Sequence, residues 1–377
     1  MNVKRLVVCC DGTWNRPDQT TQGVAAPTNV AKISLALADE DDAGNPQVLH
    51  YEAGVGTRRG ERFLGGGFGV GLSRNVQDCY RFLVDYYEPG DKLYFFGFSR
   101  GAYTARSTVG LVRNAGILRP EHRHRIKEAY ALYRNPERDS EPGGIASELF
   151  RRSYSHSEIY VDFVGVWDTV GALGIPIDGF RPPWLSRLWT FHDTKLSRYV
   201  LNAYHAIAID ERRRPFRPTL WEQQDDAKTQ QDDAKKQTLE QVWFSGVHCD
   251  VGGGYRDQGL SEIPLLWMAE KARSCGLVFK PDHLVVTGAA DDEARRAGRH
   301  VTPNHAAELH DSRTRYYRLL PPYDRRLAGD DGSDVDGGAL ASSARRRHAE
   351  DGTYRPPGLS EWLAAGKPIT PVQEESG

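Results

Sequence analysis

The chain has 377 residues, of which 39% are hydrophobic and 27% charged, as in an ordinary globular protein. Its formal net charge of −2 gives no electrostatic footprint for DNA or RNA, so we expect no nucleic-acid partner. No apolar run reaches the roughly 18 residues that a membrane-spanning helix needs, and the first residues lead into a strand rather than a signal peptide.

The cysteines predict no disulfide framework, because there are five of them and Cys9 and Cys10 lie inside an apolar run. Thiols in such a run are typical of a reducing compartment. No C-x-x-C pair marks a zinc site. We therefore expect a cytoplasmic protein with no cofactor and no metal, and leave open an export route that needs no signal peptide.

Strands and helices alternate along the first two thirds of the chain. Runs of β-branched and aromatic residues, each ending in a polar or glycine-rich turn, predict strands within 5–13, 47–57, 92–101, 159–169 and 241–250. Apolar residues at helical spacing predict helices within 27–38, 73–87 and 196–209. This alternation is typical of an α/β fold with a mostly parallel, doubly wound sheet flanked by helices.

Three segments depart from the alternation. Residues 63–75 are glycine-rich but lack the pattern of a phosphate-binding loop, so we expect flexible packing near the site. Residues 222–238 repeat QQDDAK without an apolar face, which predicts a flexible charged insertion. Beyond about residue 280 the pattern becomes irregular. We expect one main domain at 1–280 and a C-terminal extension at 281–377 packed on it.

Ligands of an open parallel sheet bind beyond the carboxyl ends of its strands. One residue expected there is Ser99, which lies between Gly97 and Gly101 in the pattern G-x-S-x-G. A strand is predicted before it and a helix after it, which is the context of a nucleophile elbow, where larger side chains at the two glycines would clash. The alternative is a serine that only caps the helix N-terminus.

A serine nucleophile needs a base, usually a histidine oriented by a carboxylate. His248, at the end of a predicted strand, is the best placed of the 12 histidines. The alternative candidates for the base are His205, interpreted as a buried structural imidazole in a helix, and His310. Asp168 follows another predicted strand and gives the order serine, aspartate, histidine that α/β-hydrolases have. Asp250, two residues from His248, is the alternative acid.

The first predicted strand ends at Asp11, which we expect to support the site by accepting backbone N–H bonds in an Asx-turn. Backbone N–H groups of Gly12 and Thr13, together with that of Arg100, are the candidates for an oxyanion hole. A helix that begins behind Ser99 favours this role, because a helix N-terminus stabilises developing negative charge.

Residues 180–191 place Trp184, Leu188 and Trp189 in a short amphipathic piece. Core packing is the default interpretation of this piece, and a lid or lipid-contacting surface that touches membranes transiently is the alternative. Basic clusters at 119–127 and 212–217 are interpreted as solvated faces or salt-bridge partners, with an anionic head-group site as the alternative.

Longer stretches carry a resemblance to a known family. They are CCDGTWN, YEAGVGT, YRFLVDYYEPGDKLYFFGFSRGAYTAR, FVGVWDTVGALG, HAIAIDERRRPFRPTLW, VWFSGVHCDVGGGY, ELHDS and YRPPGL. The chain resembles the uncharacterised α/β-hydrolase domain family whose best-studied members are type VI secretion phospholipase effectors. The resemblance implies an α/β-hydrolase-like fold and a serine-hydrolase triad with its nucleophile on Ser99, its acid on Asp168 and its base on His248.

Residues and resemblance together predict a serine hydrolase of carboxylic esters that forms an acyl-enzyme intermediate, with lipids or phospholipids as the expected substrates. A metal-dependent phosphoesterase that uses Asp11, Asp250 and His248, with Ser99 only structural, is one alternative. A non-catalytic binding module on a hydrolase fold is another, because fold alone does not fix function.

Overall fold

The computed structural model of the chain describes residues 3–12, 20–21, 24–54, 67–157, 159–170, 195–224, 236–287, 294, 298–313, 315–329 and 332–373. Its centre is an eight-stranded sheet in the order β14-β13-β10-β8-β6-β5-β1-β4. Every pair of neighbouring strands in this sheet is parallel. The strands are β1 (Arg5–Cys10), β4 (Gln47–Glu52), β5 (Lys92–Phe98), β6 (Phe163–Trp167), β8 (Asn202–Ala208), β10 (Thr238–Phe244), β13 (Gly338–Ala341) and β14 (Ile369–Thr370).

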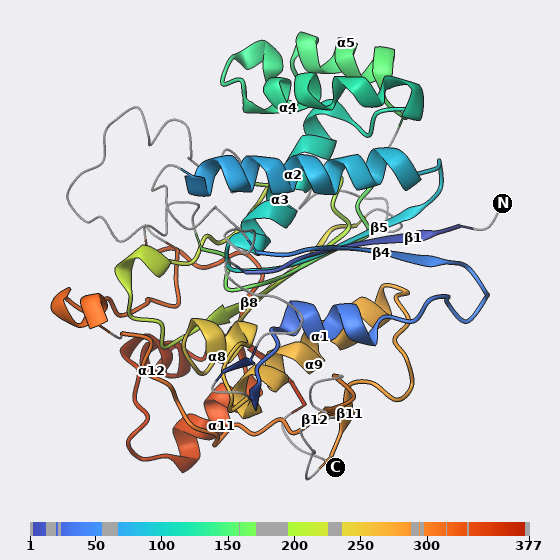
Figure 1. Ribbon diagram of the computed structural model, residues 1–377. Helices are drawn as coiled ribbons and strands as arrows, with labels where there is room; N and C mark the ends of the chain where they lie inside the picture. The colour runs from blue at the N-terminus through green and yellow to red at the C-terminus, as the bar shows by residue number, and fades with distance from the viewer. Residues whose placement is uncertain are drawn as a thin grey trace.

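Helices cover both faces of the sheet, as Figure 1 shows. The upper face in that view carries α2 (Gly67–Tyr86), α3 (Arg100–Ala115), α4 (Ile126–Arg134) and α5 (Ile145–Tyr154). The lower face carries α1 (Asn29–Ala36), α8 (His248–Gly252), α9 (Gly259–Ser274), α11 (Ser342–Glu350) and α12 (Pro357–Ala364). The predicted α/β-hydrolase-like class, with a doubly wound sheet flanked by helices, is confirmed.

Burial on both faces explains why the strands are apolar throughout. Along β1, Leu6 and Val8 pack in the core that α2 and α3 cover, whereas Val7 and Cys9 pack in the core on the other face. Alternate residues of a strand point to opposite faces, so a strand between two helical layers needs apolar residues at every position. The continuous apolar runs of the sequence follow from this layering.

The remaining elements are short. Two-residue strands pair in three small ribbons: β2 (Thr20–Thr21) with β3 (Val24–Ala25), β7 (Lys195–Leu196) with β9 (Glu222–Gln223), and β11 (Val285–Val286) with β12 (His300–Val301). Single 3₁₀ turns are η2 (Pro120–Arg125), η3 (Arg138–Ser140), η4 (Arg214–Phe216) and η6 (Arg315–Leu319). Within the predicted insertion, residues 225–235 lie outside the described part of the chain.

One predicted element is of the wrong class, and another begins earlier than predicted. The helix predicted within 196–209 is strand β8, whose residues Tyr204 and Ala206 pack on one face while Ala203 packs on the other. A short run that is apolar on every side has no distinguishing period, so its spacing could not separate helix from strand. The helix predicted within 73–87 is α2, which begins earlier, at Gly67 in the glycine-rich segment.

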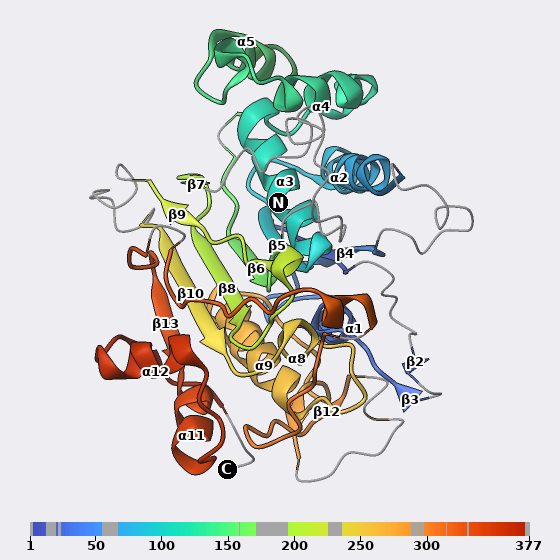
Figure 2. The ribbon, with the colours of Figure 1, turned by 90° about the vertical axis from the view of Figure 1, so that its left-hand side faces the viewer.

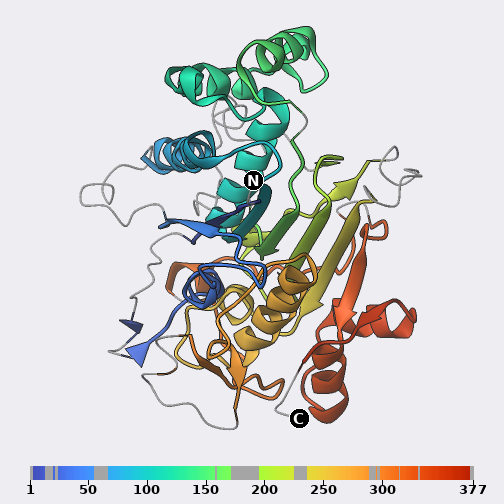
Figure 3. The same ribbon diagram turned by 90° about the vertical axis from the view of Figure 1, so that its right-hand side faces the viewer.

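The C-terminal part of the chain contributes to the same sheet. β13 pairs with β10, and β14 pairs with β13, so both strands extend the sheet at one edge. Figure 2 shows β5, β6, β8, β10 and β13 side by side, and Figure 3 shows α11 and α12 beside β13. Leu340 of β13 and Trp362 of α12 are buried in one apolar cluster with Trp243 of β10.

Candidate active site

The order in which the parallel strands are added to the sheet reverses at β1. Its neighbours are β4 on one side and β5 on the other, and both follow it in the chain. In doubly wound sheets, the crevice for ligands opens beyond the carboxyl ends of the strands at such a switch point. Asp11 follows β1 and Ser99 follows β5, so the topology brings these two residues to that edge.

Ser99 lies on a strained turn between β5 and α3. Its backbone has φ 57° and ψ −120°, a region that costs a non-glycine residue about 1–3 kcal/mol. Its N–H donates to the Trp167 carbonyl at 3.1 Å, which ties the turn to the end of β6. The Ser99 side chain makes no capping hydrogen bond to α3, so this serine does not act as a side-chain N-cap.

The two glycines around the serine leave space for this turn. A Cβ at Gly97 would lie 2.5 Å from the Cα of Ala102 in the first turn of α3. A Cβ at Gly101 would overlap the carbonyl oxygen of Cys10, so α3 packs on the end of β1 only because this residue is glycine. The sequence pattern therefore reflects backbone contacts that a side chain would block.

A buried histidine and aspartate face each other beside this turn. His248 is the first residue of α8, and its Nδ1 lies 2.6 Å from Oδ2 of Asp168, which directly follows β6. The His248 ring lies against Phe98, the residue before Ser99, with ring centroids 4.6 Å apart. Phe216 contacts the same imidazole edge-on at 5.0 Å. The two aromatic rings fix the orientation of the imidazole.

The partners of Asp168 keep its carboxylate ionised, and burial keeps the His248 imidazole neutral. Burial alone would raise the pKa of Asp168, but the Arg325 charge and the His248 hydrogen bond outweigh it and hold this pKa below its usual value. Burial lowers the pKa of His248, and the bond to Asp168 offsets only part of that effect. At neutral pH the ring is therefore able to accept a proton.

Arg325 braces Asp168, and the sequence did not reveal it. Its Nη1 donates to Asp168 Oδ1 at 2.6 Å, and its Nη2 to Oδ2 at 3.1 Å. The Ala208 carbonyl accepts from Nη1 at 2.7 Å, and the Ala208 N–H donates to Asp168 Oδ1 at 3.1 Å. Arg325 stands 157 positions after its partner in a stretch without a motif, so no local signal could have identified it.

Glu211 is a second residue that sequence reasoning missed. This buried carboxylate accepts from the His248 N–H at 3.3 Å and from the Ser312 hydroxyl at 2.9 Å. Arg213 donates to both of its oxygens, at 2.9 and 2.8 Å. Glu211 lies within the stretch HAIAIDERRRPFRPTLW, so that stretch contained a signal for it. It anchors the start of α8, and with it the position of the imidazole.

Asp250, the alternative acid, has other partners. Its Oδ2 accepts from the Val247 N–H at 3.0 Å, and its Oδ1 lies 2.6 Å from Nδ1 of His310. The hydrogen bond to Asp250 raises the pKa of His310, and Tyr255 stacks on that ring at 4.0 Å. The His310–Asp250 pair thus joins the C-terminal part of the chain to the first turn of α8.

Asp11 ties the turn after β1 to two neighbouring elements. Its Oδ1 accepts from the Gly12 N–H at 2.6 Å, and its Oδ2 accepts from the hydroxyls of Thr28, at 2.8 Å, and Tyr51. These bonds hold the turn after β1 against α1 and β4. Thr13, the other residue of the predicted oxyanion turn, lies outside the described residues.

His205 lies in β8, not in the predicted helix. It is fully buried, its Nε2 accepts from the Thr169 N–H at 3.1 Å, and its Nδ1 lies 3.3 Å from Oε1 of Gln241. Burial is the main cause that lowers its pKa to about 3. The ring is a neutral imidazole that supports the turn immediately after Asp168.

Ligand atoms of Asp11, Asp250 and His248 do not gather as a metal site requires. Within the described ranges, one group of three such residues has its ligand atoms within 4.8 Å of one another, and it consists of His50, Glu52 and Cys79. Because the other three donors are not brought together, the arrangement gives no support to the metal-dependent phosphoesterase.

Several basic residues of the predicted clusters form ion pairs. Arg123 contacts Asp85 at 2.5 Å, and Arg125 contacts Glu128 at 2.6 Å. Of the second cluster, Arg213 is bound to Glu211. The salt-bridge interpretation holds for these three arginines. The proposed lid residues Trp184, Leu188 and Trp189 lie outside the described part of the chain.

A parallel doubly wound sheet, a strained serine after β5 and a buried histidine–aspartate pair after β10 and β6 define an α/β-hydrolase-like protein. Residues 4–271 match the family described as "T6SS, Phospholipase effector Tle1-like, catalytic domain", and the chain belongs to this family.

Two individual proteins are similar to parts of the chain. The uncharacterized protein YEL023C of Saccharomyces cerevisiae is 29% identical over 235 residues, which are 57% of this chain and 32% of the yeast protein. A crystal structure of an uncharacterized protein from Pseudomonas aeruginosa is 17% identical, with a TM-score of 0.44, over 79% of this chain and 49% of that chain. The chain thus spans about a third and about a half of these proteins. Among its described helices, none is long and apolar enough to cross a membrane.

Proposed function

We propose that the protein is a serine hydrolase that cleaves carboxylic esters of lipids, with Ser99 as nucleophile, His248 as general base and Asp168 as the orienting acid. The observation that supports it most is the 2.6 Å contact between His248 Nδ1 and Asp168 Oδ2. The His248 ring also packs on Phe98, the residue before Ser99, so the pair lies beside the strained serine turn. The description of its family, which names phospholipase effectors, supports lipids as substrates.

The reaction would begin with proton transfer from the serine hydroxyl. With Nδ1 bound to Asp168, Nε2 is the nitrogen left to accept the Ser99 proton as Oγ attacks the ester carbonyl. The imidazolium that forms is stabilised by the ionised Asp168, which Arg325 keeps deprotonated. His248 then returns the proton to the leaving alcohol, and water hydrolyses the acyl-enzyme by the same steps.

The negative oxygen of the tetrahedral intermediate needs N–H donors. Arg100 directly follows Ser99 as the first residue of α3, and the N-terminus of a helix stabilises developing negative charge. The Gly12 N–H donates to Asp11 in this structure, so its use would require that bond to open. We assign the main donor to Arg100 and keep Gly12 and Thr13 as candidates for the second.

Glu211 and Arg325 act in this proposal as positioning residues. Glu211 holds the backbone N–H of His248, and Arg325 holds both oxygens of Asp168. Neither side chain needs to touch the substrate. Their effect is to keep the imidazole in the orientation and tautomer that proton transfer requires.

A substrate panel tests this function. Wild type, Ser99→Ala and the distant control Ser274→Ala would be compared on p-nitrophenyl esters of rising chain length and on phospholipid vesicles. We expect ester hydrolysis by wild type and the control, and a loss of at least about 10³-fold in kcat for Ser99→Ala, because a triad acts as a unit. Equal rates for Ser99→Ala and wild type would contradict the proposal, and activity on soluble esters alone would contradict the lipid assignment.

A further inference from the structure

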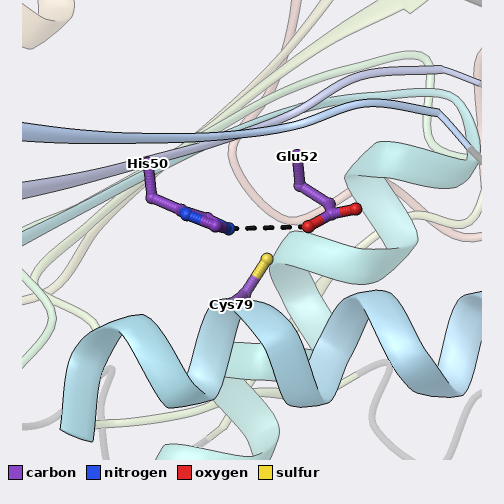
Figure 4. Close-up of side chains that lie close together, drawn as sticks. All are labelled: His50, Glu52 and Cys79. Atoms are coloured by element: carbon purple, nitrogen blue, oxygen red, sulfur yellow. Dashed lines mark ion pairs between the residues drawn. The ribbon is translucent and has the colours of Figure 1, made fainter. Parts of the chain in front are cut away.

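A second cluster of chemically reactive side chains lies away from the serine turn, between β1, β4 and α2. β1 and β4 pair in register with Cys10 opposite Glu52 and Val8 opposite His50. Residues two apart on a strand share a face, so Cys10, Glu52 and His50 project from the same side of the sheet. Cys79 approaches them from α2. Figure 4 shows the His50 ring and the Glu52 carboxylate pointing toward each other, with the Cys79 sulfur next to them.

The ligand atoms of His50, Glu52 and Cys79 lie close enough together to surround one small metal ion. His50 Nε2 lies 3.5 Å from Glu52 Oε2, and the Sγ atoms of Cys10 and Cys79 are 3.6 Å apart. With bonds of about 2.3 Å to sulfur and 2.0–2.2 Å to nitrogen or oxygen, two ligands of a tetrahedral zinc ion are about 3.4–3.8 Å apart. The ligand atoms of His50, Glu52 and Cys79 all lie within 4.8 Å of one another.

Burial of the cluster favours a ligand over simple packing. His50 Nε2 faces Glu52 Oε2 at 3.5 Å, which is longer than an ordinary hydrogen bond and leaves the two atoms apart as two ligands of one ion would be. The Cys79 side chain is fully buried and that of Glu52 is 9% exposed, whereas His50 remains 26% exposed. The imidazole stacks on Phe82 with centroids 5.1 Å apart, which holds its ring plane. The partly exposed His50 leaves a route by which an ion can enter.

The kinds of donor atoms select the metal. Thiolate and imidazole ligands suit zinc, whereas magnesium and calcium prefer oxygen ligands alone. We propose that His50 Nε2, the Glu52 carboxylate and Cys79 Sγ bind a Zn²⁺ ion, with Cys10 lying beside the site and not binding the ion. These ligands are scattered along the chain and form no C-x-x-C pair, so no sequence pattern indicated the site.

A metal at this place has a structural role. It joins β4 to α2, and the neighbouring Cys10 directly precedes Asp11 at the switch point of the sheet. The Asp11 N–H donates to the Glu52 carbonyl at 2.9 Å, so the ligand residue Glu52 borders the loop that begins the candidate active site. Binding of Zn²⁺ is therefore expected to stabilise the fold without taking part in ester cleavage.

Cobalt titration tests the site. Protein purified under reducing conditions and stripped with a chelator would be titrated with Co²⁺, whose thiolate charge-transfer band reports a sulfur ligand and whose d–d bands report tetrahedral geometry. We expect one equivalent to bind, Zn²⁺ to displace it, and Zn²⁺ to raise the Tm. Loss of one direct ligand in Cys79→Ser should weaken binding by more than the 10–100-fold typical of outer-shell partners.

Controls make the result decisive. Cys275→Ser removes a thiol outside the cluster and should keep the charge-transfer band, whereas His50→Gln should weaken Co²⁺ binding and retain that band at saturation. The proposal is wrong if wild type gives no thiolate band, if Cys79→Ser keeps it, or if intact mass shows that Cys10 and Cys79 form a disulfide under the purification conditions. The wild-type titration decides the matter even where a variant fails to fold.

Discussion

At the scale of single residues, Asp168 is the best-defined part of the site. It accepts hydrogen bonds from His248, from Arg325 and from the Ala208 N–H, and is fully buried. A buried carboxylate that is ionised needs such partners, because removing a charge from water is costly. The sequence predicted Asp168 as a site residue because it stands at the end of a predicted strand. Its partner Arg325 was not predictable, because pairing across 157 positions leaves no local sequence pattern.

The lowered pKa of His248 predicts the pH dependence of activity. A general base works in its neutral form, and burial lowers this pKa below the ordinary 6.5 despite the bond to Asp168. We therefore expect kcat/KM to rise with pH through an apparent pKa below 6.5, so that activity persists where an ordinary histidine would be protonated. A pH profile on a soluble ester measures this. An acid limb centred above pH 7 would contradict the assignment.

Substitution of Arg325 tests how Asp168 is held. Arg325→Leu leaves a buried carboxylate without its cation and should lower the free energy of unfolding by about 3–5 kcal/mol. Arg325→Lys retains the charge but not the two-pronged contact, and should fold with a lower kcat. The bond between Asp168 and His248 should then strengthen and raise the pKa of His248. The acid limb of the pH profile of Arg325→Lys should therefore move to higher pH.

Urea unfolding and pH profiles measure these two effects. A purely structural role for Arg325 would change stability but leave the acid limb of Arg325→Lys in place. Arg325→Leu with wild-type stability and activity would contradict the bracing role altogether.

At the scale of elements, the turn from β5 to α3 was predictable because its signal is local. The apolar run, the two glycines and the small residues after the serine lie within a dozen positions. β8 was assigned the wrong class for the opposite reason. Its apolar residues are buried on both faces by layers that lie far away in the sequence, so the run itself carries no period that distinguishes a strand.

Gly101→Ala tests the packing of this turn. The added Cβ would overlap the Cys10 carbonyl, and neither α3 nor β1 can move without disturbing the sheet, so we expect a loss of several kcal/mol in unfolding free energy and of ester hydrolysis. Gly143→Ala is the matched control, because its Cβ would meet nothing within 4 Å. Thermal unfolding compares them. Equal stability of the two variants would show that the close approach of α3 to β1 is not rigid.

At the scale of the whole molecule, the C-terminal part of the chain completes the sheet and braces the site. It supplies β13, which covers the edge of β10, and three of the side chains that hold site residues: Arg325 on Asp168, Ser312 on Glu211, and His310 on Asp250. The sequence indicated an irregular extension packed on the main domain. Short strands such as β13, with four residues, are too brief for their pattern to be recognised.

Removal of residues 281–377 tests this integration. The shortened chain would expose the edge of β10 and the apolar cluster around Trp243, and would leave Asp168 without its cation. We expect it to lose cooperative thermal unfolding and all ester hydrolysis. Near-ultraviolet circular dichroism and calorimetry measure the outcome. A shortened chain that unfolds cooperatively and retains wild-type kcat would show that the extension is dispensable.

Covalent labelling of the serine tests the central claim most directly. Wild type, Ser99→Ala and Ser274→Ala would be treated with a fluorophosphonate, and the modified residue would be located by peptide mass spectrometry. We predict one adduct per chain on Ser99 in wild type and Ser274→Ala, none in Ser99→Ala, and none in wild type that is denatured beforehand. Folded wild type that stays unlabelled, or an adduct on another serine, would contradict the assignment of Ser99 as the nucleophile.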